Sequence, residues 1–300
     1  MKIKTIRQVL DKKHRDFLSS IDDKKVASLV KNNSIITGGC IASMLLGEQV
    51  NDFDYYFTDK DTVRAVADYY VAKFTSSHPR QSVVVKEDEE GAKVSIFVSS
   101  SGIASAEGTT CALGLDTTES DLLEAAAALS LQLPRDPEDA PRYRPLFLTS
   151  NAITLSDKVQ LIIRFYGSPE EIHENYDFEH CKCYWTPGDG GKLVTPEKSL
   201  QALLARELVY RGSKYPIASV IRTRKFINRG WTINAGQYLK MCLQISKLDL
   251  EDPEVLEDQL TGVDAYYFSL IIKELKERKE NDPTFIPDTF YLAELIDKIF

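Results

Sequence analysis

Residues 34–58, SIITGGCIASMLLGEQVNDFDYYFT, decide the fold of this chain. The run at 34–37 predicts a short strand that ends in Gly38-Gly39, and the apolar segment at 41–46 predicts a short helix. Glycines between a strand and a helix N-terminus leave backbone N–H groups free at the positive end of the helix dipole. Because glycine lets a phosphate approach the backbone, this turn is a candidate phosphate site, although Gly-Gly alone more often marks only a tight turn.

The second half of the stretch places two acids at the start of another strand. The aromatic run at 53–57 predicts that strand, and Asp52 and Asp54, at i and i+2, project from one face. Two carboxylates so close repel each other unless a cation lies between them. Mg²⁺ is usually held by one or two carboxylates together with substrate phosphates. The pair therefore predicts a metal site, although an acidic turn beside a strand is also common without function.

Together, the glycine turn, the short helix and the acid pair resemble the head motif of the tRNA nucleotidyltransferase and poly(A) polymerase group, within the DNA polymerase β superfamily. The family pattern is Gly-Gly-x-Val-Arg-Asp-x-Leu-Leu-Gly, followed by Asp-x-Asp. The matching residues are Gly38, Gly39, Leu45, Leu46, Gly47, Asp52 and Asp54. Ala42-Ser43 replaces the Arg-Asp pair. The resemblance implies an α+β fold, with a mixed-sheet nucleotidyltransferase head followed by an all-α neck and tail.

That superfamily uses a third carboxylate on a later strand. The resemblance implies Asp177 for this role, in residues 177–185, which we expect to form a strand. Glu179, on the same face at i+2, is the fallback, and a mere strand cap is the alternative for Asp177. The implied site holds two Mg²⁺ ions among three catalytic carboxylates and an NTP as substrate. Its acids are Asp52, Asp54 and Asp177, and its phosphate-binding residues are Gly38, Gly39 and Ser43.

The resemblance continues into a helical neck at residues 220–233. The turn before it carries Tyr215-Pro216-Ile217-Ala218-Ser219, where the family has Glu-Asp-x-x-Arg to read the base edges of CTP and ATP. The preference for C and A is therefore not implied for this chain. Basic neck residues are candidates to contact the triphosphate or an RNA 3′ end, with a solvated helix face as the alternative. These residues are Arg222, Arg224, Lys225 and Arg229.

Length and charge patterning fit this organisation. The 300 residues carry a net charge of −8, which at first argues against a nucleic-acid partner. The charge is uneven, however, because residues 196–247 contain ten basic and two acidic residues, a net of +8, between two acidic segments. We predict a head at 1–190, with a polar insertion at about 100–142, and a helical region at 191–300.

The remaining predicted elements follow from hydrophobic periodicity. Strands are expected at 82–86, 93–98, 146–149 and 158–165. Helices are expected at 4–30 (one or two), 61–74, from Ser168-Pro169, and at 196–206, 216–229, 234–247, 253–260, 264–280 and 288–299. The first two of these strands form a predicted hairpin.

Several classes of protein are disfavoured by the sequence. No stretch approaches the ~18–20 apolar residues of a membrane helix, and the N-terminus has no apolar segment typical of a secretory signal. Five scattered cysteines suggest reduced thiols in a cytoplasm, that of the host if the chain is viral. His180-Cys181-x-Cys183 has no second pair nearby, so core thiols are favoured over a metal site. We therefore expect a cytoplasmic protein without a membrane partner.

Three functions remain open. The first is template-independent transfer of NMP from an NTP to a hydroxyl, with an RNA 3′ end as the favoured acceptor. The second is the same chemistry on a protein or small-molecule hydroxyl. The third is a degenerate nucleotidyltransferase fold that serves as a binding or regulatory module, which the altered Arg-Asp pair supports and the retained Asp-x-Asp opposes. The divergence of the motifs makes a phage origin conceivable.

Overall fold

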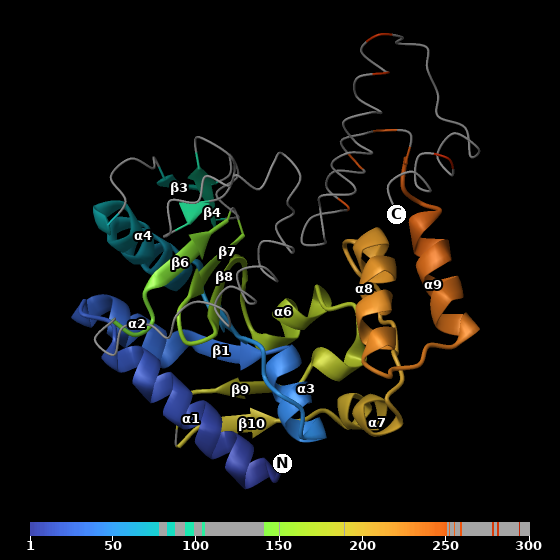
Figure 1. Cartoon of the computed structure of the whole chain (residues 1–300), viewed down its shortest axis with the longest axis horizontal. Coiled ribbons are helices and arrows are strands. Elements are labelled where there is room, and N and C mark those ends of the chain that lie inside the picture. The colour runs from blue at the N-terminus through green and yellow to red at the C-terminus, as the bar shows by residue number, and fades with distance from the viewer. Residues whose placement is uncertain are drawn as a thin grey trace. The chain divides into compact units, whose positions relative to one another are not determined.

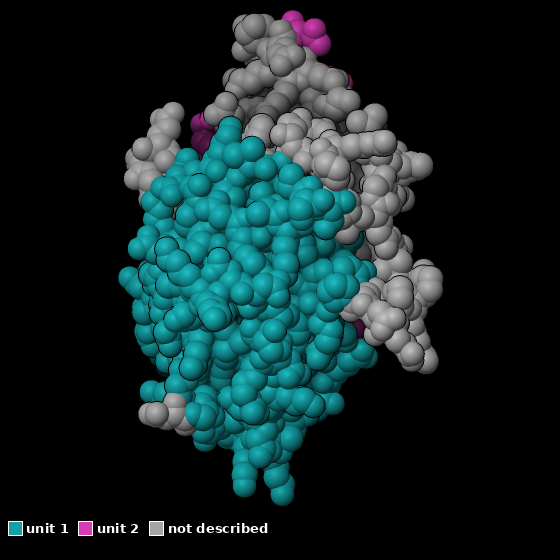
Figure 2. Space-filling view, turned by 90° about the vertical axis from the view of Figure 1, so that its left-hand side faces the viewer, with its two compact units in different colours: residues 1–110, 133–205 teal, residues 111–132, 206–300 magenta. Residues whose placement is uncertain are grey.

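The structure, a computed structural model, describes residues 1–77, 83–87, 94–98, 104–105, 141–149, 151–188 and 190–250, and six single positions beyond them. Two compact units, distinguished by colour in Figure 2, divide the chain. Unit 1 comprises residues 1–110 and 133–205, and unit 2 comprises residues 111–132 and 206–300. Nearly all of the predicted insertion at 100–142, and most of the three helices predicted after residue 250, lie outside the described residues.

An eight-stranded sheet forms the centre of unit 1, in the order β10-β9-β1-β2-β8-β7-β6-β5 (Figure 1). β2 and β8 run parallel and the other neighbours run antiparallel. The sheet is therefore mixed, and the predicted α+β class is confirmed. Its strands are β1 Ser34–Thr37, β2 Phe53–Phe57, β5 Ala104–Ser105, β6 Pro145–Leu148, β7 Ala152–Leu155, β8 Val159–Tyr166, β9 Tyr184–Thr186 and β10 Lys192–Val194. β5, β7 and β10 were not predicted.

Helices cover both faces of this sheet (Figure 1). The helices of unit 1 are α1 Ile3–Ser19, α2 Lys24–Asn33, α3 Gly39–Leu46, α4 Lys60–Ser77, α6 Pro169–Glu174 and α7 Glu197–Ala205. On one face, Phe17 of α1 packs edge-on against Tyr55 of β2, with ring centroids 5.1 Å apart. On the other face, Ile172 of α6 packs in a small core with Tyr56. Because side chains alternate along a strand, Asp54 lies on the α6 face with Tyr56.

Local signals explain the shorter elements around the site. Gly47, with φ +77°, ends α3 in the left-handed conformation. Ser168 and Glu171 form a reciprocal capping box at the start of α6, with proline in the first turn. The predicted hairpin is present as β3 Val83–Glu87 and β4 Val94–Val98.

Unit 2 contains two helices among its described residues, α8 Pro216–Asn228 and α9 Ala235–Ile245. The segment before α8 is fixed to α9 by Gln244, which accepts from the Tyr210 hydroxyl and donates to the Ser213 carbonyl. A parallel bridge joins Glu207 to Thr232. Both predicted helices are confirmed, whereas β10 and α7, which follow residue 190, lie in unit 1. In the part of the chain that is described, no helix is both long and apolar enough to span a membrane.

Candidate active site

The glycine turn between β1 and α3 has a backbone that only glycine adopts readily. Gly38 has φ +88° and ψ −149°, a region that is essentially closed to residues with a Cβ atom. Its N–H donates to the Cys181 carbonyl at 3.2 Å, so the turn is tied to the segment after α6. The sequence signal for a strand–glycine–helix turn is thereby confirmed.

The two glycines face different surroundings. A Cβ atom added to Gly38 would lie 2.9 Å from Oδ2 of Asp54, whereas one added to Gly39 would meet no described residue within 4 Å. Asp54 is opposite Thr37 in the antiparallel β1–β2 register, which brings its carboxylate to this turn. Gly38 therefore makes room for the acid, and Gly39 leaves open space at the N-terminus of α3, where free N–H groups favour anions.

The acid pair is electrostatically strained. Burial, and then the charge of Asp52, raise the pKa of Asp54 well above its usual value. The Cys40 thiol is buried beside the pair, and burial followed by the charges of Asp54 and Asp52 raises its pKa. Two adjacent carboxylates in such a place require either a proton or a cation. Hard oxygen donors of this kind suit Mg²⁺, so the residues present fit the predicted metal.

A neutral histidine lies behind the turn. The Thr37 hydroxyl lies 2.8 Å from Nε2 of His173 and donates to the Cys183 carbonyl at 2.9 Å. Because the hydroxyl has one proton, which it donates to the carbonyl, we assign the proton of the first contact to Nε2 of His173. Burial, and then the charge of Lys182, lower the pKa of His173 to about 4, so the ring is neutral at pH 7.

A tyrosine pair completes the α6 side of the site. The Tyr176 hydroxyl lies 3.5 Å from the position of a Cβ atom on Gly38. Burial raises its pKa, and the neighbouring Tyr56 and the charge of Asp54 add to this. Neither tyrosine was predicted as a site residue. The period-2 alternation of β2 is enough to place Tyr56 on the face of Asp54, whereas no local pattern marks Tyr176 or His173.

The strand predicted at 177–185 is wrong. Asp177 lies in a bend after α6, Glu179 begins the 3-10 helix Glu179–Cys181, and only Tyr184–Thr186 is extended as β9. The i, i+2 argument that made Glu179 a fallback therefore fails. Both acids are buried. Within the described ranges, no three His, Cys, Asp or Glu side chains are grouped closely enough to hold a metal ion.

The strand beside the acid pair is β8, and it offers an amide. Asp54 is in register with Gln160 in the parallel β2–β8 ladder, so the two side chains project from the same face. Gln160 is partly buried. A carboxamide oxygen can ligate a cation or accept from a bound water, but it adds no charge. The structure thus places Asp52 and Asp54 together, with an uncharged neighbour.

The other predicted phosphate ligands differ in exposure and in the unit to which they belong. Ser43 is buried within α3, 6% exposed. Arg224, Lys225 and Arg229 are exposed at the C-terminal half and end of α8, and Arg222 is partly exposed. These four basic residues belong to unit 2, so their role beside the head stays a prediction.

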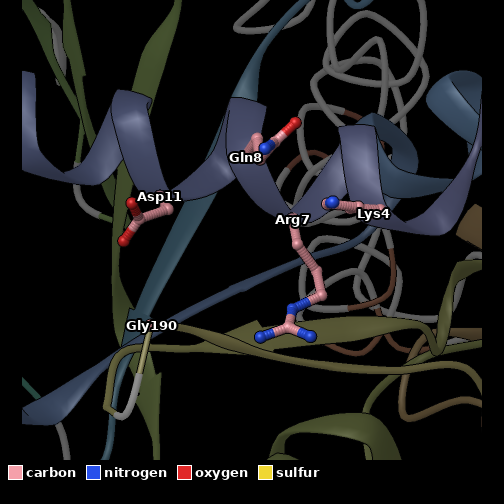
Figure 3. Close-up of a pocket in the computed structure, with 5 residues that line it drawn as sticks. All are labelled: Lys4, Arg7, Gln8, Asp11 and Gly190. Atoms are coloured by element: carbon pink, nitrogen blue, oxygen red, sulfur yellow. The ribbon is translucent and has the colours of Figure 1, made fainter.

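A hollow of about 200 Å³ lies elsewhere on unit 1 (Figure 3). Arg7 points from α1 toward the strands below it in this view, and its Nε donates to the Gly191 carbonyl at 3.1 Å. Asp11 is already paired with Arg15 at 2.9 Å. The hollow is lined by Lys4, Arg7, Gln8, Asp11 and Gly190. Neither acid of the candidate pair contributes to it, so it is separate from the site.

Comparison with known proteins gives a family match over most of unit 1. The model of a family described as "Gabija anti-defense 2 family protein" matches residues 8–206. A curated relative, "Gabija anti-defense 2" of Bacillus phage SPbetaL7, is 19% identical over 282 residues, which cover 93% of this chain and 51% of that protein. The chain therefore spans about half the length of the relative that it matches.

Solved structures with some likeness are CCA-adding enzymes. The Thermotoga maritima enzyme complexed with tRNA has a TM-score of 0.40 and 12% identity, over 92% of this chain and 57% of its own. The Bacillus stearothermophilus enzyme in complex with CTP has a TM-score of 0.36 and 11% identity, over 86% of this chain and 51% of its own.

Proposed function

Because this chain belongs to the Gabija anti-defense 2 family, we propose that it serves a phage against the Gabija defence, in the cytoplasm of the host. We further propose that it does so as a metal-dependent nucleotidyltransferase, which transfers NMP from an NTP to a hydroxyl. The observation that carries this proposal is the closeness of the Asp54 carboxylate to Gly38, where a Cβ atom would lie 2.9 Å from Oδ2, because it places the acid pair beside the turn that begins α3.

Each group of residues in the site has a separate role in the proposed reaction. Asp52 and Asp54 would hold Mg²⁺, which when bound neutralises the triphosphate and the leaving pyrophosphate and lowers the pKa of an attacking hydroxyl. The backbone N–H groups at Gly39 and in the first turn of α3 would bind the phosphates, because a helix N-terminus favours anions and no described residue lies within 4 Å of the Cβ position of Gly39. Neutral His173 and the Thr37 hydroxyl hold the turn in place rather than exchange protons with substrate.

Other groups complete the proposed machinery. We assign Asp177 to an outer position on the metal side, because no three acids form a ligand group within the described ranges. The basic residues of α8, with Arg222 and Arg224 on the helix, contact the triphosphate or the acceptor. An RNA 3′ hydroxyl is the favoured acceptor, since the segment 196–247 carries a net charge of +8 and phosphate contacts dominate affinity for nucleic acids.

The test is transfer of label from α-³²P-NTPs by the full chain in Mg²⁺, offered total RNA and total protein from the host. We expect labelled RNA from the wild type and none from Asp52→Asn/Asp54→Asn. Asp61→Asn, which removes an exposed carboxylate at the start of α4, should stay active. Labelled protein without labelled RNA would show that the acceptor is a protein hydroxyl. Full activity of the double variant would refute the proposal that the acid pair catalyses the transfer.

A second candidate is a binding module that opposes the defence without catalysis. The neutral Gln160 beside Asp54, in place of an acid on the neighbouring strand, favours it. Phage plating on a host that carries Gabija separates the two. Protection that is lost in Asp52→Asn/Asp54→Asn supports the enzyme, and protection that the double variant retains in full supports the binding module.

A further inference from the structure

The turn that leads into β8 has an unusual backbone. Asp157 and Lys158 both have φ +61°, in the left-handed region that hairpin turns normally fill with glycine or asparagine. A residue with a Cβ atom is destabilised there, and lysine gains nothing from the conformation itself. A backbone strained in this way persists only where contacts of the surrounding structure hold it, and such positions cluster at functional sites.

Neighbouring groups hold the turn in this conformation. The carboxylate of Asp157 accepts from Nε of Arg142 at 3.2 Å and from the backbone N–H of Tyr143 at 3.3 Å. The ammonium of Lys13 donates to the Asp157 carbonyl and lies 4.9 Å from the centroid of the Phe53 ring. The strained turn is thus fixed from three sides, and one of its partners also touches the first residue of β2.

Lys158 reaches from this turn to the loop that carries Asp52. Its Nζ donates to the Val50 carbonyl at 3.0 Å, and its own carbonyl accepts from the Phe53 N–H at 2.8 Å. Asp52 lies between these two points. The same lysine therefore holds the chain two residues before the acid and one residue after it.

The two acids differ in how the sheet fixes them. Asp54 lies within β2, paired with Thr37 on one side and Gln160 on the other. Asp52 precedes the strand and is exposed, so the ladder does not set its position. Its distance from Asp54 depends on the conformation of residues 50–53, which is where Lys158 acts.

We propose that Lys158 is a positioning residue, which holds the loop before β2 so that Asp52 and Asp54 share one divalent cation. This inference rests on the proposed function, because it takes the acid pair as the metal site. It explains why lysine occupies a left-handed position. The side chain is needed for the contact with Val50, and the backbone conformation directs it there.

The test is a titration of the purified full chain with Mn²⁺, in which the EPR signal of free Mn²⁺ reports how much is bound. The melting temperature of each variant is measured in parallel. Lys158→Met keeps the aliphatic stem and removes the donor. We expect it to weaken Mn²⁺ binding about threefold to tenfold, the range of one net hydrogen bond. Lys158→Arg, which keeps a donor, should restore most of the affinity.

The direction of the effect separates positioning from charge. Removal of a positive charge near a cation site strengthens cation binding by Coulomb's law alone, so weaker binding by Lys158→Met isolates the positional role. Lys158→Gly gives a second contrast. Glycine relieves the strain of the left-handed backbone, so we expect the melting temperature to hold or rise while the Mn²⁺ affinity falls. If Lys158 had only a structural role, Lys158→Gly would lower the melting temperature and the Mn²⁺ affinity together.

The outcomes distinguish this inference from the function on which it rests. Mn²⁺ binding that is lost in Asp54→Asn but unchanged or tighter in Lys158→Met and Lys158→Gly overturns the role of Lys158 alone. A wild-type chain that takes up no Mn²⁺ overturns both proposals. If Lys158→Met does not fold, the glycine variant decides by the same comparison.

Discussion

Substitution of the two adjacent glycines by alanine should have opposite effects. At Gly38 the backbone has φ +88°, and the new Cβ atom would lie 2.9 Å from Oδ2 of Asp54. Gly39 begins α3, and in the part of the chain that the structure describes its new Cβ atom has no neighbour within 4 Å. The two changes add the same methyl group one residue apart, so each is the matched control of the other.

The expected magnitudes follow from the two environments. Alanine at Gly38 adds backbone strain of about 1–3 kcal/mol, and the displacement of a packed carboxylate adds about 1–3 kcal/mol more. The free energy of unfolding should therefore fall by about 2–6 kcal/mol. Alanine at Gly39 removes unfolded-state entropy within a helix and should raise the free energy of unfolding by about 0.5–1 kcal/mol.

Urea unfolding followed by circular dichroism measures these changes, and calorimetry with a non-hydrolysable NTP in Mg²⁺ measures the function. Gly39→Ala should be stable and yet bind the nucleotide more weakly, because its methyl group stands before the α3 N–H groups. A Gly38→Ala chain as stable as the wild type would refute the packing argument. A Gly39→Ala chain with unchanged nucleotide affinity would refute the phosphate site.

Three further predictions concern charge. Because burial and the charge of Asp52 raise the pKa of Asp54, the stability that its neutral form contributes is complete below the unfolded value of 3.8 and is lost as pH rises through the folded pKa. Asp54→Asn should therefore raise the melting temperature at pH 7 in EDTA, as measured by differential scanning fluorimetry. Gln160→Glu adds a third carboxylate beside the pair, so Mn²⁺ should bind more tightly by EPR while the metal-free chain melts earlier. Burial, and then Lys182, lower the pKa of His173 from 6.5 to about 4, so stability falls as pH drops from 6.5 toward 4. In urea titrations, the free energy of unfolding of His173→Gln should fall by about 2 kcal/mol less than that of the wild type between pH 7 and pH 5.

The sequence was sufficient for the parts of the site that local chemistry determines. β1, the glycine turn, α3 and β2 follow from residues 34–57 alone, because strand, turn and helix signals there agree with one another. The position of Asp54 against Gly38 depends on the β1–β2 register, which one short connection fixes. Long-range partners such as Gln160 of β8 lie beyond such signals, since more than a hundred residues separate the paired strands.

The error at Asp177 has a specific physical cause. Residues 177–185 contain aromatic residues, which suit a strand. The preceding α6 ends at Glu174, however, and the chain must turn back toward β1. The 3-10 helix Glu179–Cys181 makes that turn, and its last carbonyl accepts the Gly38 N–H. A segment whose backbone serves the glycine turn in this way is not free to form a straight strand, and only the tertiary contact reveals it.

The two acids of the pair therefore differ in how far sequence can specify them. Asp54 is placed by a register that any sequence forming β1 and β2 would share. Asp52 lies outside the ladder, and its position depends on Lys158, a residue more than a hundred positions away in a strained turn. A chain can thus keep the Asp-x-Asp pattern and lose the metal site by relaxing that turn. In the proposed site, the motif supplies the two carboxylates, and the distant lysine determines whether their separation suits a cation.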